Sequence, residues 1–287
     1  MSSETTSAQR QVAVVSLGLP PPSSSKNYKS TAERTNTIPE TVCVYDAVQG
    51  TKIASHRLEG ACAGMTANDK AVITTRAGKA TTAIFAWGRE SPVSRFAAPE
   101  QLGPIVFSND GIHIAAGGVS GSVYVWELCT GQLLCAWKAH YRKVLALKFT
   151  DDDAVLVTGG DDAMVHLWDF AQALANEAIP ERSLLRTVTA SRTGVTGIAC
   201  GSGGILSRIA TSSLDHTCRV FSAASGVEAF CATYSNALLC VCLDIAETQV
   251  YTGSIDGLVH VGDLINGGTF SLSGHEAAVT CLSLIHI

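Results

Sequence analysis

Four side chains near the middle of the chain are of types that can do chemistry together. They are His140, Thr158, Asp162 and Trp168. A histidine beside a carboxylate and a hydroxyl activates a nucleophile in many hydrolases, provided that the hydroxyl is exposed next to the base. The same residue types can instead form a buried chain of hydrogen bonds that fixes a turn, which the indole N–H of Trp168 would complete.

Repetition of the surrounding segment favours the structural interpretation. A pattern made of a small-residue strand end, a tight turn and an alternating apolar strand occurs at Ala116–Trp126, Thr158–Trp168, Thr211–Phe221 and Thr252–Gly262. The turn aspartate recurs as Asp215 and Asp256, and Ser120 takes its place in the first copy. Because an active site is not built several times in one molecule, we expect a structural network and no catalytic residue.

The ends of these copies define a repeating unit. The terminal positions, with two further candidates upstream, are Tyr45, Trp87, Trp126, Trp168, Phe221 and Gly262. They follow one another at 42, 39, 42, 53 and 41 residues. A four-stranded propeller blade needs about 40–45 residues. The sequence therefore predicts an all-β fold, a β-propeller of the seven-blade type, forming one domain over residues 1–287.

Two segments interrupt the regular period. A Pro/Ser-rich stretch at residues 20–39, after the strand candidate Val12–Leu17, predicts a long flexible loop within the first blade. The 53-residue interval contains Phe170–Arg186, whose Ala, Leu and Glu content predicts a short helical or irregular insertion between blades.

The last repeat is incomplete from residue 275. Gly274-His275 opens it and Val279–Leu284 predicts one strand of a seventh blade. We expect the open ring to expose strand edges, so that this chain is poorly soluble and the remainder of the blade restores solubility.

Composition excludes several classes of function. The formal net charge of −5 argues against nucleic-acid binding through bulk charge, although a local basic patch remains compatible with it. No apolar run reaches the roughly 18 residues of a membrane span, and no signal peptide is seen. Most of the ten cysteines lie in apolar strand-like runs, as expected of reduced, structural thiols. The histidines are scattered and no phosphate loop is present, so we expect no metal, cofactor or small-molecule substrate.

The pattern from His140 to Trp168-Asp169 resembles the WD-repeat family, and the resemblance covers nearly the whole chain. Three segments are similar to one subfamily, the WD-repeat subunit of the yeast IPI complex and its animal and plant root-initiation relatives. They are Leu133–Thr150, Arg208–Gly226 and Ser273–Leu284. That complex processes the second internal transcribed spacer of pre-ribosomal RNA. The family forms a closed seven-blade ring, which is only partly present here.

This resemblance implies a non-enzymatic scaffold in the nucleolus and nucleoplasm. Its partners would be the other subunits of a complex that assembles the large (60S) ribosomal subunit, and the pre-ribosomal particle. A second role in replication-origin licensing is also implied. Direct contact with RNA stays open.

Loops on a rigid frame usually carry binding, so the insertion and the basic cluster after His140 are candidate contacts. The residues concerned are Arg142, Lys143, Glu181 and Arg182. The alternatives are a purely decorative surface loop and a solvated basic loop.

Two other classes of function remain. The first is a substrate receptor of a cullin-type ubiquitin ligase, or another generic WD-repeat adaptor. Such receptors resemble one another in carrying an Arg two residues after Trp-Asp, whereas Ala171 stands there after Trp168-Asp169. A propeller enzyme needs convergent acids or a metal cluster at the central channel, and the sequence suggests none.

Overall fold

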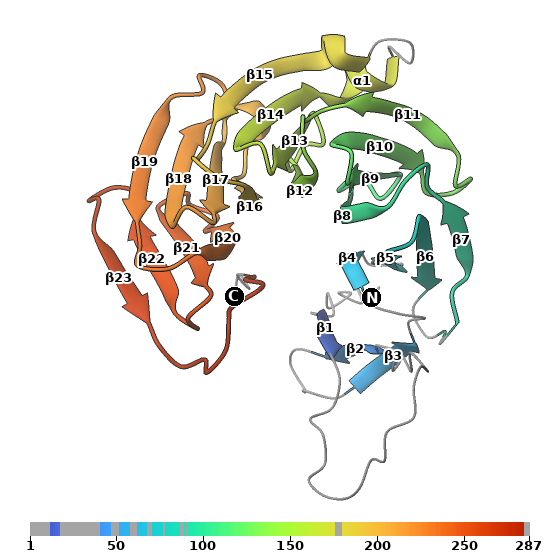
Figure 1. Ribbon diagram of the computed structural model, residues 1–287, viewed down its shortest axis with the longest axis horizontal. Coiled ribbons are helices and arrows are strands. Elements are labelled where there is room, and N and C mark those ends of the chain that lie inside the picture. Colours follow the sequence, from blue (N-terminus) through green and yellow to red (C-terminus); the bar gives the residue numbers. More distant parts are fainter. Residues whose placement is uncertain are drawn as a thin grey trace, which may run out of the picture.

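The computed structural model describes residues 12–17, 41–46, 52–57, 62–67, 71–76, 78–86, 89, 91–175 and 180–283. These residues form five four-stranded antiparallel sheets and one three-stranded sheet. Each four-stranded sheet consists of four consecutive strands, and the sheets succeed one another around an arc with their first strands innermost (Figure 1). The predicted all-β propeller is therefore confirmed.

The strands follow the predicted period. The three-stranded sheet contains β1 (Val12–Leu17), β2 (Thr41–Asp46) and β3 (Lys52–Arg57). The four-stranded sheets, or blades, contain β4 (Cys62–Ala67), β5 (Ala71–Arg76), β6 (Thr81–Ala86) and β7 (Ser94–Ala97); β8 (Leu102–Phe107), β9 (His113–Gly118), β10 (Ser122–Glu127) and β11 (Leu133–Lys138); β12 (Val144–Phe149), β13 (Val155–Gly160), β14 (Met164–Asp169) and β15 (Leu184–Thr189); β16 (Val195–Cys200), β17 (Arg208–Ser213), β18 (Thr217–Ser222) and β19 (Glu228–Thr233); β20 (Leu238–Leu243), β21 (Gln249–Ser254), β22 (Val259–Asp263) and β23 (Thr269–Leu272). Residues 20–39 and Trp87 lie outside the described residues.

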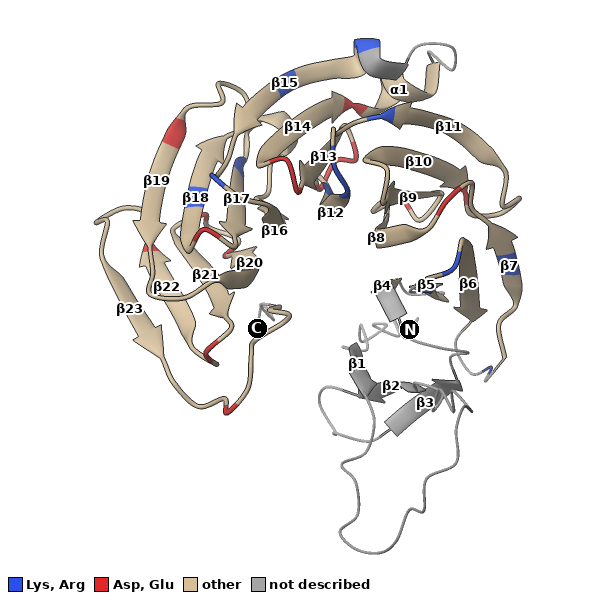
Figure 2. Ribbon diagram, viewed as in Figure 1, with Lys and Arg blue, Asp and Glu red and all other residues tan. Residues whose placement is uncertain are grey.

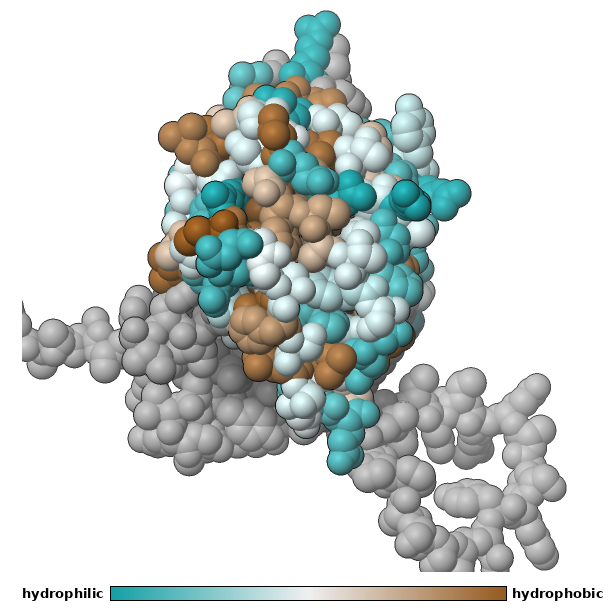
Figure 3. Space-filling view, turned by 90° about the vertical axis from the view of Figure 1, so that its left-hand side faces the viewer, coloured by the Kyte–Doolittle hydropathy of each residue, from teal (hydrophilic) through white to brown (hydrophobic). Residues whose placement is uncertain are grey.

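Position within a blade decides what is buried. All six residues of β13, a second strand, are buried, whereas all four residues of the outermost strand β23 are exposed. The apolar ends of the repeats are buried as expected, with Trp126, Trp168 and Phe221 all in the core. Seen from the side of β19 and β23, the rim is a mosaic of apolar and polar residues (Figure 3).

Successive blades are joined by contacts between a glycine and a valine. A Cβ added at Gly117, near the end of β9, would lie 2.5 Å from Val144 Cβ at the start of the next blade. A Cβ added at Gly159 would lie 2.9 Å from Val195 Cγ1. Side chains larger than hydrogen cannot fit at these positions, so the small-residue strand ends of the repeat let consecutive blades approach closely.

The C-terminal segment follows the same rule without forming a strand. A Cβ added at Gly253 would lie 2.6 Å from Val279 Cγ1, and Val279 is buried where the first residue of another blade would lie. The predicted strand Val279–Leu284 is nevertheless absent over residues 279–283, and Leu284 lies outside the described residues. An inner strand needs a second strand of its own blade for its ladder, and no described strand lies there.

The predicted insertion lies within a blade rather than between two. It forms α1 (Phe170–Ala175) and the 3₁₀ helix η1 (Pro180–Ser183), and Leu184–Arg186 already belong to β15, which pairs with β14. The expectation of an inter-blade insertion was therefore wrong, because the outermost strand of this sheet comes from residues after the Trp168 position.

Helix α1 closes the gap between two blades. Phe170 and Ala173 are buried in a core that also contains Trp137 of the preceding blade. The ring of Phe170 meets Phe149 at 4.9 Å and His113 at 5.2 Å between centroids.

No helix in the described part of the chain is long and apolar enough to cross a bilayer.

The packing of α1 predicts a stability effect. Phe170→Ala should lower the free energy of unfolding by about 3–5 kcal/mol, because it removes a buried ring that two blades share. Ala175→Ser, at an exposed position of the same helix, should change it by less than about 0.5 kcal/mol. Urea unfolding of both variants measures the difference, and equal stability would show that α1 is peripheral.

Candidate functional site

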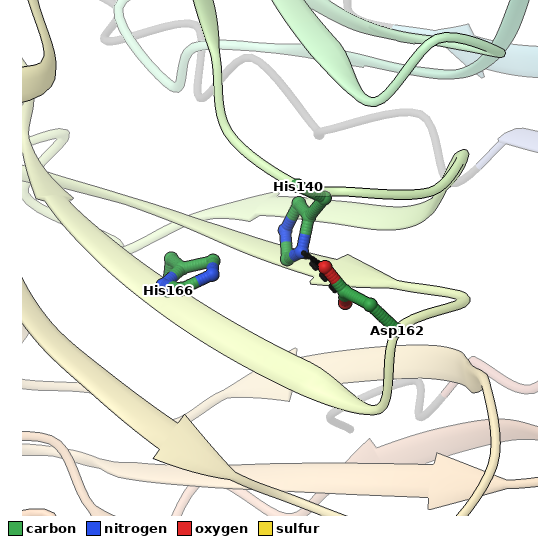
Figure 4. Close-up of side chains that lie close together, drawn as sticks. All are labelled: His140, Asp162 and His166. Carbon is green, nitrogen blue, oxygen red and sulfur yellow. Dashed lines mark hydrogen bonds and ion pairs between the residues drawn. The ribbon is translucent and has the colours of Figure 1, made fainter.

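The structure brings together the four residues of the predicted network. His140 Nδ1 lies 3.0 Å from Asp162 Oδ1, and His140 Nε2 lies 2.9 Å from Thr158 Oγ1. Trp168 Nε1 donates to the same Thr158 oxygen at 3.0 Å. The contacts run from Asp162 in the β13–β14 turn, through His140 in the loop before β12, to Thr158 and Trp168 in the core. Figure 4 shows the His140–Asp162 contact.

Backbone groups complete the coordination of the carboxylate. Asp162 Oδ2 accepts from the amide of Tyr141 at 3.0 Å, and Oδ1 accepts from the amide of Met164 at 3.2 Å. Gly160 makes room for this arrangement, since a Cβ there would lie 2.4 Å from Asp162 Oδ1 and 2.5 Å from His140 Nδ1.

Burial makes this network a poor nucleophilic site. Thr158 is fully buried and His140 is nearly so, so no substrate can reach the hydroxyl. Burial lowers the pKa of His140 although Asp162 opposes the shift, which favours the neutral imidazole. A neutral ring can donate from Nδ1 to Asp162 and accept at Nε2 from Thr158, whose oxygen then accepts from Trp168. Every side-chain nitrogen and oxygen of these four residues therefore has a hydrogen-bond partner.

His166 joins this cluster, which the sequence reasoning missed. The ligand atoms of His140, Asp162 and His166 all lie within 4.8 Å of one another, a spacing that could suit a metal ion. Both ring nitrogens of His140 are already hydrogen-bonded, and His166 Nδ1 lies 2.8 Å from Thr187 Oγ1. A metal would have to displace these bonds, so the geometry favours an internal polar cluster. Only the two-residue strand spacing between His166 and Trp168 could have indicated it.

The other turn aspartates are held without a histidine. Asp215 accepts from the amides of Arg192 at 2.7 Å and Thr217 at 3.0 Å. Asp256 accepts from the side-chain amide of Asn236 at 2.7 Å and the amide of Leu258 at 3.1 Å. In each blade the carboxylate therefore ties its turn to the loop that precedes the innermost strand.

Glu100 supplies the missing carboxylate where Ser120 replaces aspartate. Its Oε2 accepts from the Ser120 amide at 2.8 Å, and its Oε1 accepts from Ser120 Oγ at 2.5 Å and from Tyr124 Oη at 2.9 Å. The acid has moved from the turn to the loop before β8. No local sequence signal marks Glu100, because it lies outside the repeated segment.

A similar replacement occurs at Gly262, where the repeat has lost its aromatic end. A Cβ added there would lie 2.8 Å from the ring of Phe230, which comes from β19 of the preceding blade. Phe230 occupies part of the space that a tryptophan would otherwise need.

The predicted contact residues do not form one surface. Arg142 and Lys143 are exposed in the loop before the innermost strand β12, and Arg142 Nη1 lies 4.0 Å from Asp161 Oδ2. Arg182 is exposed in η1, on the outer rim beside α1 (Figure 1). The side chain of Glu181 lies outside the described residues. Two separate candidate contacts result.

The innermost strands surround a central channel of about 580 Å³. Its lining is formed mainly by small and apolar residues of β8, β12, β16 and β20, and Lys143 is the charged residue in that lining. A lining of this kind can select a bound segment by its shape, but it contributes few groups for acid–base chemistry.

The buried network predicts that replacing its threonine lowers the free energy of unfolding more than replacing an exposed threonine does. Thr158→Val should lower the free energy of unfolding by about 1–3 kcal/mol, because it leaves His140 Nε2 and Trp168 Nε1 buried without a partner. Thr189→Val is the matched control at an exposed position of β15 and should cost less than about 0.5 kcal/mol. Equal effects in chemical denaturation would contradict the role of the network.

The paired imidazoles predict sensitivity to acid. Burial and the neighbouring His140 lower the pKa of His166 to about 4, whereas the unfolded chain takes up this proton at about pH 6.5. Between these values the unfolded chain binds more protons, so stability falls as the pH falls through this window. His166→Gln should lose less stability than the parent chain on going from about pH 7 to about pH 5. An acid dependence in His166→Gln that equals that of the parent chain would refute this.

Comparisons with known proteins agree with this architecture. A family model described as WDR54 matches residues 62–222, more than half of the chain. Mouse WD repeat-containing protein 18 is 33% identical over 192 residues, covering 61% of this chain and 43% of that protein. Protein ROOT INITIATION DEFECTIVE 3 of Arabidopsis thaliana is 29% identical, covering 70% of this chain and 48% of its own.

A fungal protein shows the same likeness. Pre-rRNA-processing protein IPI3 of Meyerozyma guilliermondii is 30% identical over 224 residues, covering 70% of this chain and 48% of its own. The chain thus spans about half the length of the curated relatives it matches, and the resemblance to the WD-repeat subfamily is confirmed. With its match to more than half of the residues, the chain belongs to the WDR54 family of WD-repeat proteins.

Proposed function

We propose that this protein is a non-enzymatic scaffold in ribosome biogenesis, as a subunit of a nuclear complex that processes pre-rRNA. The likeness to a pre-rRNA-processing protein across several blades carries the proposal. The geometry supports it, because His140, Thr158 and Asp162, which could have formed an active site, are instead hydrogen-bonded to one another in a buried network. The partners would be the other subunits of that complex and the precursor of the large (60S) subunit.

The shape of the molecule suits this role. Rigid blades hold turns and loops in fixed positions, so partner segments can bind without ordering the scaffold. Arg142 and Lys143 at the inner end of one blade and Arg182 at the rim, with Glu181 beside it, are the proposed contacts. We place the protein in the nucleolus and nucleoplasm, with a second role in replication-origin licensing.

Affinity purification of the tagged full-length protein from its own cells tests the proposal. Mass spectrometry should recover large-subunit assembly factors, and RNA blotting should detect precursors that contain the second internal transcribed spacer. A tagged unrelated propeller expressed at the same level serves as the control. Recovery of a cullin adaptor without pre-ribosomal components, or normal spacer processing after depletion, would refute the proposal.

A further inference from the structure

One face of the propeller carries six carboxylates in the turns that join the first and second strands of three blades. The acids are Asp110, Asp151, Asp152, Asp153, Asp244 and Glu247. Red segments in Figure 2 mark where acidic residues lie in the described blades, on connecting turns and also on strand β19. Two cations lie near them, Lys148 and Arg208, and the amide of Arg208 donates to Glu247.

Hydrogen bonds between blades hold these turns rigidly. Asp153 accepts from the amides of Asn109 and Asp110, each at 2.8 Å, in the preceding blade. Asp151 accepts from the amides of Gly203 at 3.0 Å and Gly204 at 2.9 Å in the following blade. Those two amides lower the pKa of Asp151, so its carboxylate is charged at neutral pH.

Exposed apolar side chains lie directly beside these acids. Leu206 is 81% exposed, Ile205 37% and Ile245 57%. The two turns that carry them touch, since Ser202 Oγ donates to the carbonyl oxygen of Ile245 at 3.3 Å. We call Ile205, Leu206 and Ile245, with Asp151, Asp152 and Asp244, the acidic-apolar surface. Exposed apolar side chains that cluster within a rim of polar residues are typical of protein-binding surfaces.

We propose that the acidic-apolar surface binds a basic amphipathic segment of a protein partner. Apolar side chains of that segment would pack on Leu206 and Ile245, and its Lys or Arg residues would face Asp151 and Asp152. Charge complementarity selects this occupant, because the same carboxylates repel a nucleic-acid backbone. The inference rests on the proposed scaffold role and deepens it by naming one surface and the chemistry of its partner.

Site-specific photo-cross-linking tests this surface. The probe is p-benzoylphenylalanine placed at position 206 of the tagged full-length protein in its own cells. Mass spectrometry should identify cross-linked peptides from protein segments that contain apolar residues and an excess of Lys and Arg. The matched control site is Val227, which is 64% exposed on a turn at the same face, where Arg186 Nη1 donates to Ser225. Position 227 should not cross-link those segments.

A second measurement uses substitutions that leave the core intact. Leu206→Ser combined with Ile245→Ser should lower recovery of the cross-linking partner at least about tenfold, the equivalent of about 1.4 kcal/mol, whereas Val227→Ser should not. Cross-links from position 206 to RNA, to acidic segments or to a second copy of this chain would overturn the proposal, as would unchanged partner recovery. If position 206 gives no cross-link to a basic protein segment while pre-rRNA still co-purifies, this surface alone is refuted and the proposed function stands.

Discussion

Close approach of each blade to the next is the constraint on which this structure depends. It requires a residue with almost no side chain near the end of the second strand, where Gly117, Gly159 and Gly253 lie against valines of the following segment. The same approach positions the loops between blades. The carbonyl of Gly121 accepts from the amides of Ala139 and His140, so one blade's turn supports the loop that enters the next. The hydrogen-bonded network around His140 starts from that support.

What recurs from blade to blade is a satisfied carboxylate rather than a fixed residue. Asp162 receives an imidazole and two amides, Asp215 receives amides, and Glu100 reaches Ser120 from the opposite side. A buried or half-buried charge is tolerated only where donors surround it, and several local solutions supply those donors equally well. This explains how the repeat diverges while the blade persists.

Both faces of the propeller use carboxylates to fix their connecting turns. On the face of His140 the polar side chains are largely committed to fixing turns within and between blades. On the other face, carboxylates such as Asp151 and Asp153 bridge neighbouring turns through backbone amides. Apolar residues such as Leu206 lie exposed beside them.

The sequence by itself determined the fold class, the period, the buried aromatic ends and the residues of the network, because each is a local pattern repeated at fixed spacing. Only the tertiary structure decided which distant residue fills a gap in that pattern: Glu100 for the aspartate lost at Ser120, Phe230 for the aromatic lost at Gly262, and α1 as a wedge between two blades. It also brought His166 to His140. These contacts join separate elements, and packing between elements leaves no periodic mark on the chain.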